Sequence, residues 1–498
     1  MSGRGARDRR RLPHLRGAPI AADVDSTELS AKVAAGMPQL KQELAALVAI
    51  PSISEWGFPE HTRAALLEAH QAVVELFRDA GVESFTSLEL EGTAPVITGE
   101  IPGPAGAPTV LLYGHYDVVP AGDEALWTSP PFEATARDGA IFGRGAADSK
   151  ANILVHVGAL RAFGGAPPVG VKILLEGQEE VGSPLEDGYP SDNPEPFKAD
   201  AIIVADGGSI RAGQPSLTVS LRGDARITVE VRTLASNKHS GQYGGAAPDA
   251  LVVLLRVLST LWDENGDVAV DGLRREEWTG EAYTDDEFRA LAEIEPGLPI
   301  VGTGGIGSKI WSGPGITVLG IDCPAVDGAP ASVQANARAV LNVRVHPEQP
   351  AGEAQAAVMR HLEAQRPFGV PVAVTAGATG DGFRASSSGV AWHAMVAAMS
   401  SAWGAETVEI ATGGAIPLVK AMSDGVPDAA IFVFGCTDSS PTSTAPTSAC
   451  SSTSGRRPCS PSPCSSRSSQ AERRDRDERR RDATGRARGK EGLRSRAR

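Results

Sequence analysis

Three short apolar runs in this sequence each end close to residues that can bind a metal ion. Short β-branched and aliphatic runs that alternate with helical stretches are typical of buried parallel strands. In open α/β sheets, ligands bind beyond the carboxyl ends of the strands. We therefore expect one imidazole and several carboxylates to meet in a single cleft. The runs are Val110–Tyr113, followed by His115 and Asp117; Ile173–Leu175, followed by Glu179 and Glu180; and Ile202–Val204, followed by Asp206.

The pattern along the chain predicts two domains, one of which is discontinuous. At 498 residues the chain exceeds the usual size of one domain. Strands and helices alternate through residues 26–213 and again through 381–438, which predicts an α/β catalytic domain with a mostly parallel sheet. Residues 214–380 hold period-two strands in an order typical of an inserted α+β domain with an antiparallel sheet. Residues 1–25 are predicted to be a flexible basic extension.

Periodicity places the main elements. The expected helices are Met37–Val48, Thr62–Ala80, Ala151–Phe163, Asp249–Trp262, Glu353–Gln365 and Val390–Ala402. The strands expected in the inserted domain are Leu217–Leu221, Ile227–Val231, Ile316–Gly320, Ala337–Val345 and Val370–Val374.

The C-terminal tail has a different composition. After the strand-like run Ala429–Phe434, residues 439–498 contain one large aliphatic residue, Leu493, and no aromatic residue. Such a segment cannot bury enough apolar surface to offset its ordering entropy, so it is predicted to be disordered. The tail carries a formal charge of +9 and residues 1–438 carry −23. The acidic body argues against nucleic acid as a partner.

Other features favour a cytoplasmic protein that does not contact a membrane. The Arg-rich start is not followed by an apolar stretch of signal-peptide length, and no run of 18 apolar residues occurs. Cys323 and Cys436 lie in the body and the other three cysteines lie in the tail. This spacing indicates no disulfide framework.

The pair His115 and Asp117 lies two residues apart beyond a strand, so both side chains can enter one cleft. A neutral imidazole is a good ligand for Zn²⁺ or Mn²⁺, and a nearby carboxylate often fixes its tautomer. A structural histidine is the alternative. Asp148 follows a glycine-rich turn immediately before a predicted helix, where it is either an N-cap or a carboxylate that bridges two cations.

Two adjacent carboxylates, Glu179 and Glu180, leave the second strand. They repel each other in a poorly solvated place unless a cation or a proton lies nearby. One would bind metal, and the other, with a raised pKa, would take a proton from the attacking water. A solvated loop is the alternative. Asp206, followed by two glycines, adds another carboxylate.

Together these segments resemble the M20 family of dinuclear zinc peptidases, in particular the carnosinase-like dipeptidases. The resemblance covers residues from about 30 to 438 and keeps the family's order and spacing. The matching pieces are G-H-Y-D-V-V-P, G-R-G-A-A-D-S-K, E-G-Q-E-E-V-G-S, V-A-D-G-G, K-H-S-G-Q-Y-G-G and G-G-A-I-P. The resemblance implies a zinc-peptidase-like catalytic domain with an inserted lid that forms a homodimer.

The resemblance also assigns roles to the metal-binding residues. It implies that His115 and Asp206 hold one cation, Asp148 bridges, and Glu180 holds the second. Asp117 would orient the imidazole. Two Zn²⁺ ions are implied, with Mn²⁺ or Co²⁺ as alternatives.

Further roles are implied for substrate binding and proton transfer. Glu179 would be the general base and acid, and His239 would reach into the site of the partner subunit and polarise the substrate carbonyl. Arg344 would clamp the substrate carboxylate bidentately. Gly414 and Ala415 would line the substrate pocket, although Ala415 stands where a serine is common in the family.

The chain departs from the family at one metal ligand. The family places a final histidine, followed by Asn-Glu, just beyond the strand that corresponds to Ala429–Phe434, whereas this chain has no histidine after His393. Back-translation of residues 447–454 with G/C-rich codons, read one base out of phase, can spell N-E-R-V-L-L-D-E. We therefore hypothesise that the reading frame was lost near Asp438.

These observations predict hydrolysis of a dipeptide or short peptide that has a free C-terminal carboxylate, with activity impaired by the missing histidine. Deacylation of N-acyl amino acids by the same centre is one alternative. A non-catalytic binding protein or pseudoenzyme is the other, and the absent ligand favours it. Glu179, which binding alone does not require, favours an enzyme.

Overall fold

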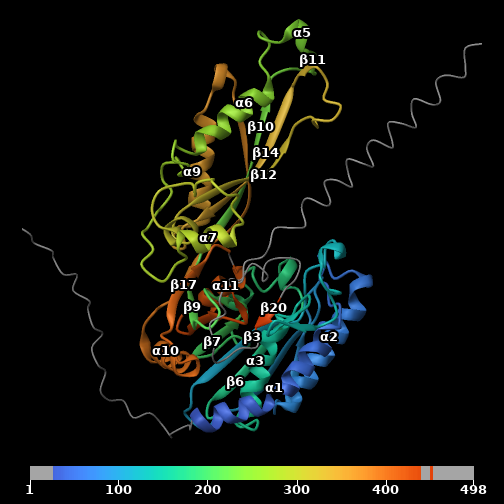
Figure 1. Ribbon diagram of the computed structural model, residues 1–498, viewed down its shortest axis with the longest axis vertical. Coiled ribbons are helices and arrows are strands. Elements are labelled where there is room, and N and C mark those ends of the chain that lie inside the picture. The colour runs from blue at the N-terminus through green and yellow to red at the C-terminus, as the bar shows by residue number, and fades with distance from the viewer. Residues whose placement is uncertain (1–25, 415, 439–448, 452–498) are drawn as a thin grey trace, which may run out of the picture. The chain divides into compact units, whose positions relative to one another are not determined.

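The computed structural model describes residues 26–414, 416–438 and 449–451. Its larger sheet has nine strands, and eight of them follow one order across the sheet (Figure 1). A ninth strand, β17 (Val408–Thr412), pairs with β9 in parallel. The order is β1 (Ser84–Leu88), β2 (Val96–Ile101), β6 (Gly170–Glu176), β3 (Thr109–His115), β7 (Ala201–Ala205), β18 (Ala430–Phe434), β9 (Ser216–Leu221) and β16 (Phe383–Arg384).

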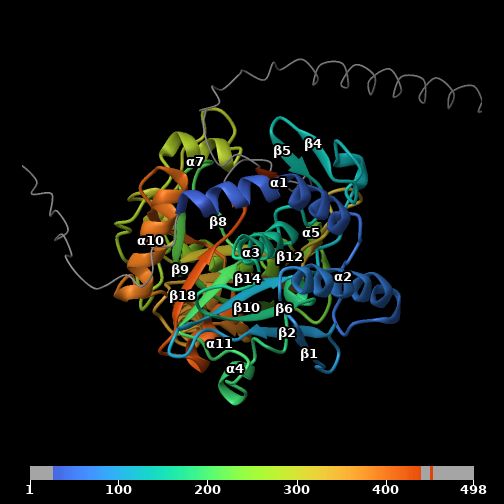
Figure 2. The same cartoon turned by 90° about the horizontal axis from the view of Figure 1, so that it is seen from below.

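The centre of this sheet, from β6 through β3 and β7 to β18, is parallel. Alternate residues of β3 enter different cores: Leu112 packs on one face, and Leu111 and Tyr113 pack on the other. Because both faces are covered, these strands are almost continuously apolar. The helices on the first face are α1 (Ser26–Val48), α2 (Glu60–Asp79) and α3 (Lys150–Ala162) (Figure 2), and those on the second are α4 (Tyr189–Asp192) and α11 (Pro417–Gly425).

The second sheet is antiparallel and has four strands. Along β10, buried residues such as Ile227 and Val229 alternate with more exposed ones, as expected for a sheet covered on one face. The covering helices are α6 (Ala250–Leu258) and α9 (Ala351–Ala364), which share one apolar core with the sheet. The strand order is β12 (Gly315–Asp322), β14 (Asn336–Val345), β10 (Gly223–Arg232) and β15 (Ala373–Gly380).

Short elements connect the two sheets and surround their edges. The 3-10 turns are η1 (Glu124–Leu126), η2 (Glu179–Val181), η3 (Ser259–Leu261) and η4 (Pro367–Gly369). The short strands are β4 (Thr135–Arg137), β5 (Ala140–Phe142), β8 (Gly208–Ser209), β11 (Lys238–His239), β13 (Ser332–Val333), β19 (Thr437–Asp438) and β20 (Ala449–Ser451). The remaining short helices are α5 (Ser240–Tyr243), α7 (Asp285–Leu291) and α8 (Ile306–Ile310). The longer helix α10 (Gly389–Trp403) packs against β7, β9 and β18 of the larger sheet through Trp392 and Met399. None of the helices in the described part of the chain is long and apolar enough to cross a membrane.

The predicted sheet types are confirmed, but one strand was assigned to the wrong sheet. The strand expected at Leu217–Leu221 is β9, and it belongs to the larger sheet and not to the inserted domain. All six of its residues are buried, so its alternation of small polar and large apolar residues does not mark a solvent-exposed face. The strand expected at Val370–Val374 begins later, as β15, because its pairing with β10 sets its register.

The tail prediction is corrected at three residues. Ala449–Ser451 form β20, whose backbone pairs antiparallel with β5. Backbone pairing along an exposed strand edge needs no apolar side chains, so composition alone does not exclude it. The rest of the predicted disordered tail, 439–448 and 452–498, and the predicted extension 1–25 lie outside the described residues.

Candidate metal centre

Six residues singled out from the sequence lie around the carboxyl ends of three neighbouring strands. The strands β6, β3 and β7 are adjacent and parallel, so their ends meet at the same edge of the sheet. The residues are His115 and Asp117 at the end of β3, Asp148 before α3, Glu179 and Glu180 in η2 after β6, and Asp206 after β7. The topology explains why residues up to 91 positions apart come together.

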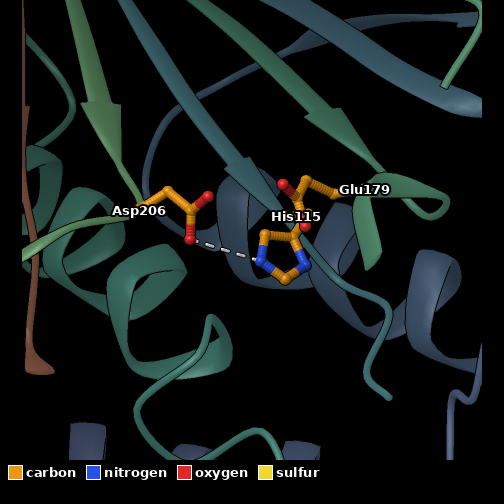
Figure 3. A group of neighbouring side chains, drawn as sticks. All are labelled: His115, Glu179 and Asp206. Atoms are coloured by element: carbon orange, nitrogen blue, oxygen red, sulfur yellow. Dashed lines mark ion pairs between the residues drawn. The ribbon is translucent and has the colours of Figure 1, made fainter. Parts of the chain in front are cut away.

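The imidazole of His115 lies at the centre of this group. Its side chain is fully buried, and its Nε2 atom lies 3.0 Å from Oδ1 of Asp148 and 3.5 Å from Oδ1 of Asp206. Figure 3 shows His115, Glu179 and Asp206 pointing toward one another. On the opposite side of the ring, Nδ1 lies 3.3 Å from Oδ1 of Asp117. Nε2 is therefore the nitrogen that faces the other donors.

The buried carboxylate of Asp117 has two further contacts. Its Oδ1 atom accepts the backbone N–H of Glu179 at 3.3 Å, and its Oδ2 atom accepts that of Glu180 at 3.2 Å. One carboxylate therefore holds both the ring of His115 and the turn that carries the two glutamates. This contact supports the predicted role of Asp117 in orienting His115.

Asp148 does not cap the helix that follows it. The N-cap of α3 is Ser149, and no side chain accepts a capping hydrogen bond there. The Asp148 side chain is 52% exposed and lines the cavity described below. The helix-cap alternative is therefore not observed, and the carboxylate is placed to bind a ligand.

The electrostatics of the group fit divalent cations. Burial opposes protonation of His115, but hydrogen bonds with Asp117, Asp148 and Asp206 outweigh it and raise the pKa of this imidazole well above its usual value. Burial also raises the pKa of Glu179 to about 9 and that of Glu180 to about 7, with neighbouring carboxylates adding to both. Close buried carboxylates require compensating positive charge. Cations would supply this charge, and one imidazole among carboxylates is a donor set that Zn²⁺ and Mn²⁺ accept.

The ligand atoms form two overlapping groups, each within 4.8 Å. One consists of His115, Glu179 and Asp206, and the other of His115, Asp148 and Glu180. His115 is common to both groups, so the two sets of carboxylates lie around one imidazole. Glu179, expected to remain unligated, lies as close to the first group as a ligand would.

The donors open into a cavity of about 1070 Å³. Asp148, Glu179, Glu180 and Asp206 line it, together with Gly414 and residues of the segment 283–311. This volume is at the upper end of the usual range for small-molecule sites and is large enough for a dipeptide.

Comparison with known proteins identifies the family. Residues 111–453 match the peptidase family M20/M25/M40. The chain belongs to this family. It is 35% identical over 429 residues to the cysteinylglycine-S-conjugate dipeptidase of Corynebacterium striatum, covering 84% of this chain and 93% of that protein. It is 28% identical over 408 residues to the Beta-Ala-His dipeptidase of Rattus norvegicus, covering 78% of this chain and 80% of the relative. The fold is similar to that of human carnosine dipeptidase 1, with a TM-score of 0.69 and 22% sequence identity. The match covers 85% of this chain and 94% of that protein.

Two other residues predicted for this M20 site, His239 and Arg344, are not placed at the donors. His239 is exposed on β11, where its Nδ1 accepts the N–H of Gly241 at 3.1 Å. Arg344 lies on β14 opposite Asp224. Neither is among the described residues that line the cavity. Their predicted roles therefore stay predictions, and Ala415 lies outside the described residues.

The position of the missing histidine also lies outside the described residues. After β18 the chain forms β19, which pairs with β8, and Thr437 and Asp438 line the cavity. The next ten residues are not described. His393, the last histidine of this M20 chain, is exposed on α10, and it is not among the described residues of the cavity wall.

Several residues that shape the M20 site could not be found from motifs. Asn152, inside α3, accepts the N–H of Cys436 at 2.8 Å and donates to the Ala147 carbonyl at 3.3 Å. It therefore links α3 both to the turn that carries Asp148 and to the segment that follows β18. A polar residue inside an otherwise apolar helix was the only signal for it in the sequence.

Glu176, at the end of β6, gives a prediction about stability. Burial raises the pKa of this carboxyl to about 7, and Tyr113 donates a hydrogen bond to it at 2.7 Å. In the unfolded chain it ionises near pH 4.5, so the folded state holds more protons between pH 4.5 and 7 and loses stability as the pH rises. We expect Glu176→Gln to remove this loss and to increase the free energy of unfolding at pH 8 by about 3 kcal/mol. Urea denaturation of the wild type and Glu176→Gln at pH 5 and pH 8 measures this free energy. If the free energy of unfolding depends on pH equally in both proteins, the raised pKa of Glu176 is contradicted.

Proposed function

We propose that this M20 chain is a dinuclear metallodipeptidase that hydrolyses dipeptides with a free C-terminal carboxylate. The buried imidazole of His115 among carboxylates at the edge of the cavity is the observation that carries the proposal. The dipeptidase names of the relatives from Corynebacterium striatum and Rattus norvegicus support the substrate class.

The donors divide between two divalent cations, which we propose are Zn²⁺, with Mn²⁺ or Co²⁺ as alternatives. His115 and Asp206 would hold the first cation and Glu180 would hold the second. Asp148 would contribute to both. When bound, such cations polarise the scissile carbonyl and lower the pKa of a water molecule. Asp117 keeps Nδ1 of His115 protonated, so that Nε2 is free to act as a ligand.

Glu179 is the proton carrier in this proposal. Burial raises the pKa of its carboxyl, and bound cations would lower that pKa toward neutrality, where such a group accepts a proton from the attacking water and delivers it to the leaving amine. The backbone N–H of Glu179 donates a hydrogen bond to Asp117, and this bond fixes the position of the Glu179 backbone beside His115. His239 from a partner subunit would polarise the carbonyl, and Arg344 would bind the substrate carboxylate.

We also propose a homodimer formed through the second sheet. The edge strand β12 exposes Val318, Leu319 and Ile321, and helix α6, which packs on β14 and β10, exposes Val252 and Leu255. An exposed edge strand and an exposed apolar helix face are both typical of self-association. Light scattering during gel filtration is expected to give twice the chain mass of 51.6 kDa. A mass of one chain at micromolar concentration would rule out a stable dimer.

Because the final histidine is absent, we propose that the chain as written holds its second cation weakly and turns over slowly. The experiment is a screen of dipeptides and N-acetyl amino acids with Zn²⁺- or Mn²⁺-loaded protein, repeated after chelation. Slow, metal-dependent release of amino acids from dipeptides supports the proposal. Faster turnover of N-acetyl substrates would indicate a deacylase, and no turnover of either class would indicate a binding protein or pseudoenzyme.

A further inference from the structure

One side of the cavity is apolar, although the donors that share the cavity are charged. Tyr283, Phe288, Leu291 and Trp311 line it, and we call these four residues the α7 wall. Phe288 and Leu291 are three positions apart on α7 and therefore lie on one face of the helix. Both are only partly buried, so part of each side chain remains available to a bound molecule.

Two residues of the α7 wall, Tyr283 and Trp311, are packed against the larger sheet. The Trp311 ring lies 5.5 Å from that of Tyr283 and is 3% exposed. Ile410 of β17 belongs to the same apolar core. The backbone N–H of Glu281 donates to the carbonyl of Glu409 at 3.0 Å, which ties the start of this segment to β17. Tyr283 and Trp311 are therefore held in place by the protein itself.

A single arginine fastens α7 near the metal centre. Arg211, which follows β8, donates from Nη2 to Glu287 at 2.7 Å and from Nη1 to Glu281 at 2.6 Å. Its Nε atom also donates to Glu287, so the pair is bidentate. Glu287 in turn accepts the N–H of Thr284 at 2.8 Å in a capping box at the start of α7. The position of Phe288 is thus set by the neighbouring Glu287.

The four residues of the α7 wall carry no charge, whereas the cavity's charged groups lie among the donors and their neighbours. A charged substrate side chain would lose its hydration against this wall without gaining a partner. A large apolar side chain would instead be stabilised by about 25 cal/mol for each Å² removed from water.

We propose that the α7 wall is the pocket for a large apolar side chain of the substrate and that Arg211 is the positioning residue that holds this wall. The preferred substrates are then dipeptides with one bulky aromatic or long aliphatic side chain. This inference rests on the proposed dipeptidase function, whose failure the binding experiment below detects separately.

Selectivity tests the pocket. We expect kcat/KM to be about tenfold or more higher for Phe-Gly than for Ala-Gly, or for Gly-Phe than for Gly-Ala, with Asp-Gly and Gly-Asp poorest. Phe288→Ala and, as a second variant, Leu291→Ala should each reduce this ratio by about tenfold, mainly through KM. Ratios near one at both substrate positions, or ratios unchanged in both variants, would overturn the proposal.

Arg211 is tested by comparing two ion pairs. Arg211→Met should reduce the ratio of kcat/KM between the phenylalanine and alanine dipeptides, mainly through KM, because α7 loses the ion pairs that hold it to Arg211. The matched control is Arg338→Met, which removes an ion pair with Asp322 on the second sheet and should leave the ratio unchanged. If Arg211→Met and the wild type have equal ratios of kcat/KM, Arg211 does not position the wall. If the ratio falls as far in Arg338→Met as in Arg211→Met, the effect is not specific to Arg211 and the positioning role is also excluded.

Calorimetry separates this inference from the proposed function. On chelated protein, the better of Phe-Gly and Gly-Phe should bind about tenfold more tightly than its alanine counterpart, and Phe288→Ala should abolish that difference. Such binding without hydrolysis by the loaded protein would support the pocket and refute the dipeptidase proposal. Hydrolysis of dipeptides without any preference for the apolar side chain would support the dipeptidase proposal and refute the pocket.

Discussion

Replacing Glu179 by glutamine is expected to reduce kcat by about 10²–10⁴-fold while metal content stays the same. The physical reason is that glutamine keeps the size and the backbone contact to Asp117 but cannot accept a proton. Single-turnover kinetics and elemental analysis on the same preparations measure both quantities. A change in KM alone would not meet the expectation, because proton transfer belongs to the chemical step.

Two further variants make this test specific. Glu180→Gln should lower cation retention, since Glu180 is proposed as a ligand. Glu186→Gln is the matched control, because burial raises the pKa of Glu186 to about 7 as well, but this residue lines a different cavity. If Glu179→Gln loses metal as Glu180→Gln does, Glu179 is a ligand, as its closeness to His115 and Asp206 allows, and the general-base assignment fails.

Restoring the reading frame after Asp438 is expected to produce the second large effect. With G/C-rich codons, a one-base correction can return the family-like sequence N-E-R-V-L-L-D-E, and under this hypothesis the restored segment would also contain the missing histidine. The second cation should then be retained through dialysis, and kcat/KM for dipeptides should increase by at least about 100-fold, since loss of a residue that only supports a metal ligand typically costs 10–100-fold and loss of a ligand itself should cost more.

Two further experiments test the reading-frame hypothesis. Resequencing the gene across this region shows whether the shift is real, and a gene sequence without a shift would dispose of the hypothesis. If the corrected chain binds no more metal than the chain as written, the second cation does not depend on that segment, and the impairment proposal is wrong.

The sequence predicted where the donors meet because the information is local to each strand. Apolar runs mark β3, β6 and β7, and the residues after each run lie at one sheet edge in any parallel arrangement. The convergence of His115 with Asp206 follows from this rule. Asp148 comes from the turn before α3, and its approach to His115 depends on how that helix packs. The catalytic and ligand roles of these residues stay predictions.

Other parts of the site depend on contacts between distant segments. The α7 wall is formed by a loop-rich segment whose place is set by Arg211, about 75 residues earlier, and no periodicity signals such a pair. The strand β9 was assigned to the inserted domain because Thr218 and Ser220 resemble a solvent-exposed face, yet both are buried. Tertiary packing decides such positions, and local propensity does not.

The most direct test is the metal content of purified wild-type protein and Asp148→Ala after incubation with Zn²⁺ and exhaustive dialysis. Asp148 is chosen because its carboxylate approaches Nε2 of His115 and is proposed to contact both cations. We predict that the wild-type chain retains at least one zinc ion per chain and that Asp148→Ala retains far less. Equal zinc retention by the two proteins, or none by the folded wild type, would contradict the metal centre.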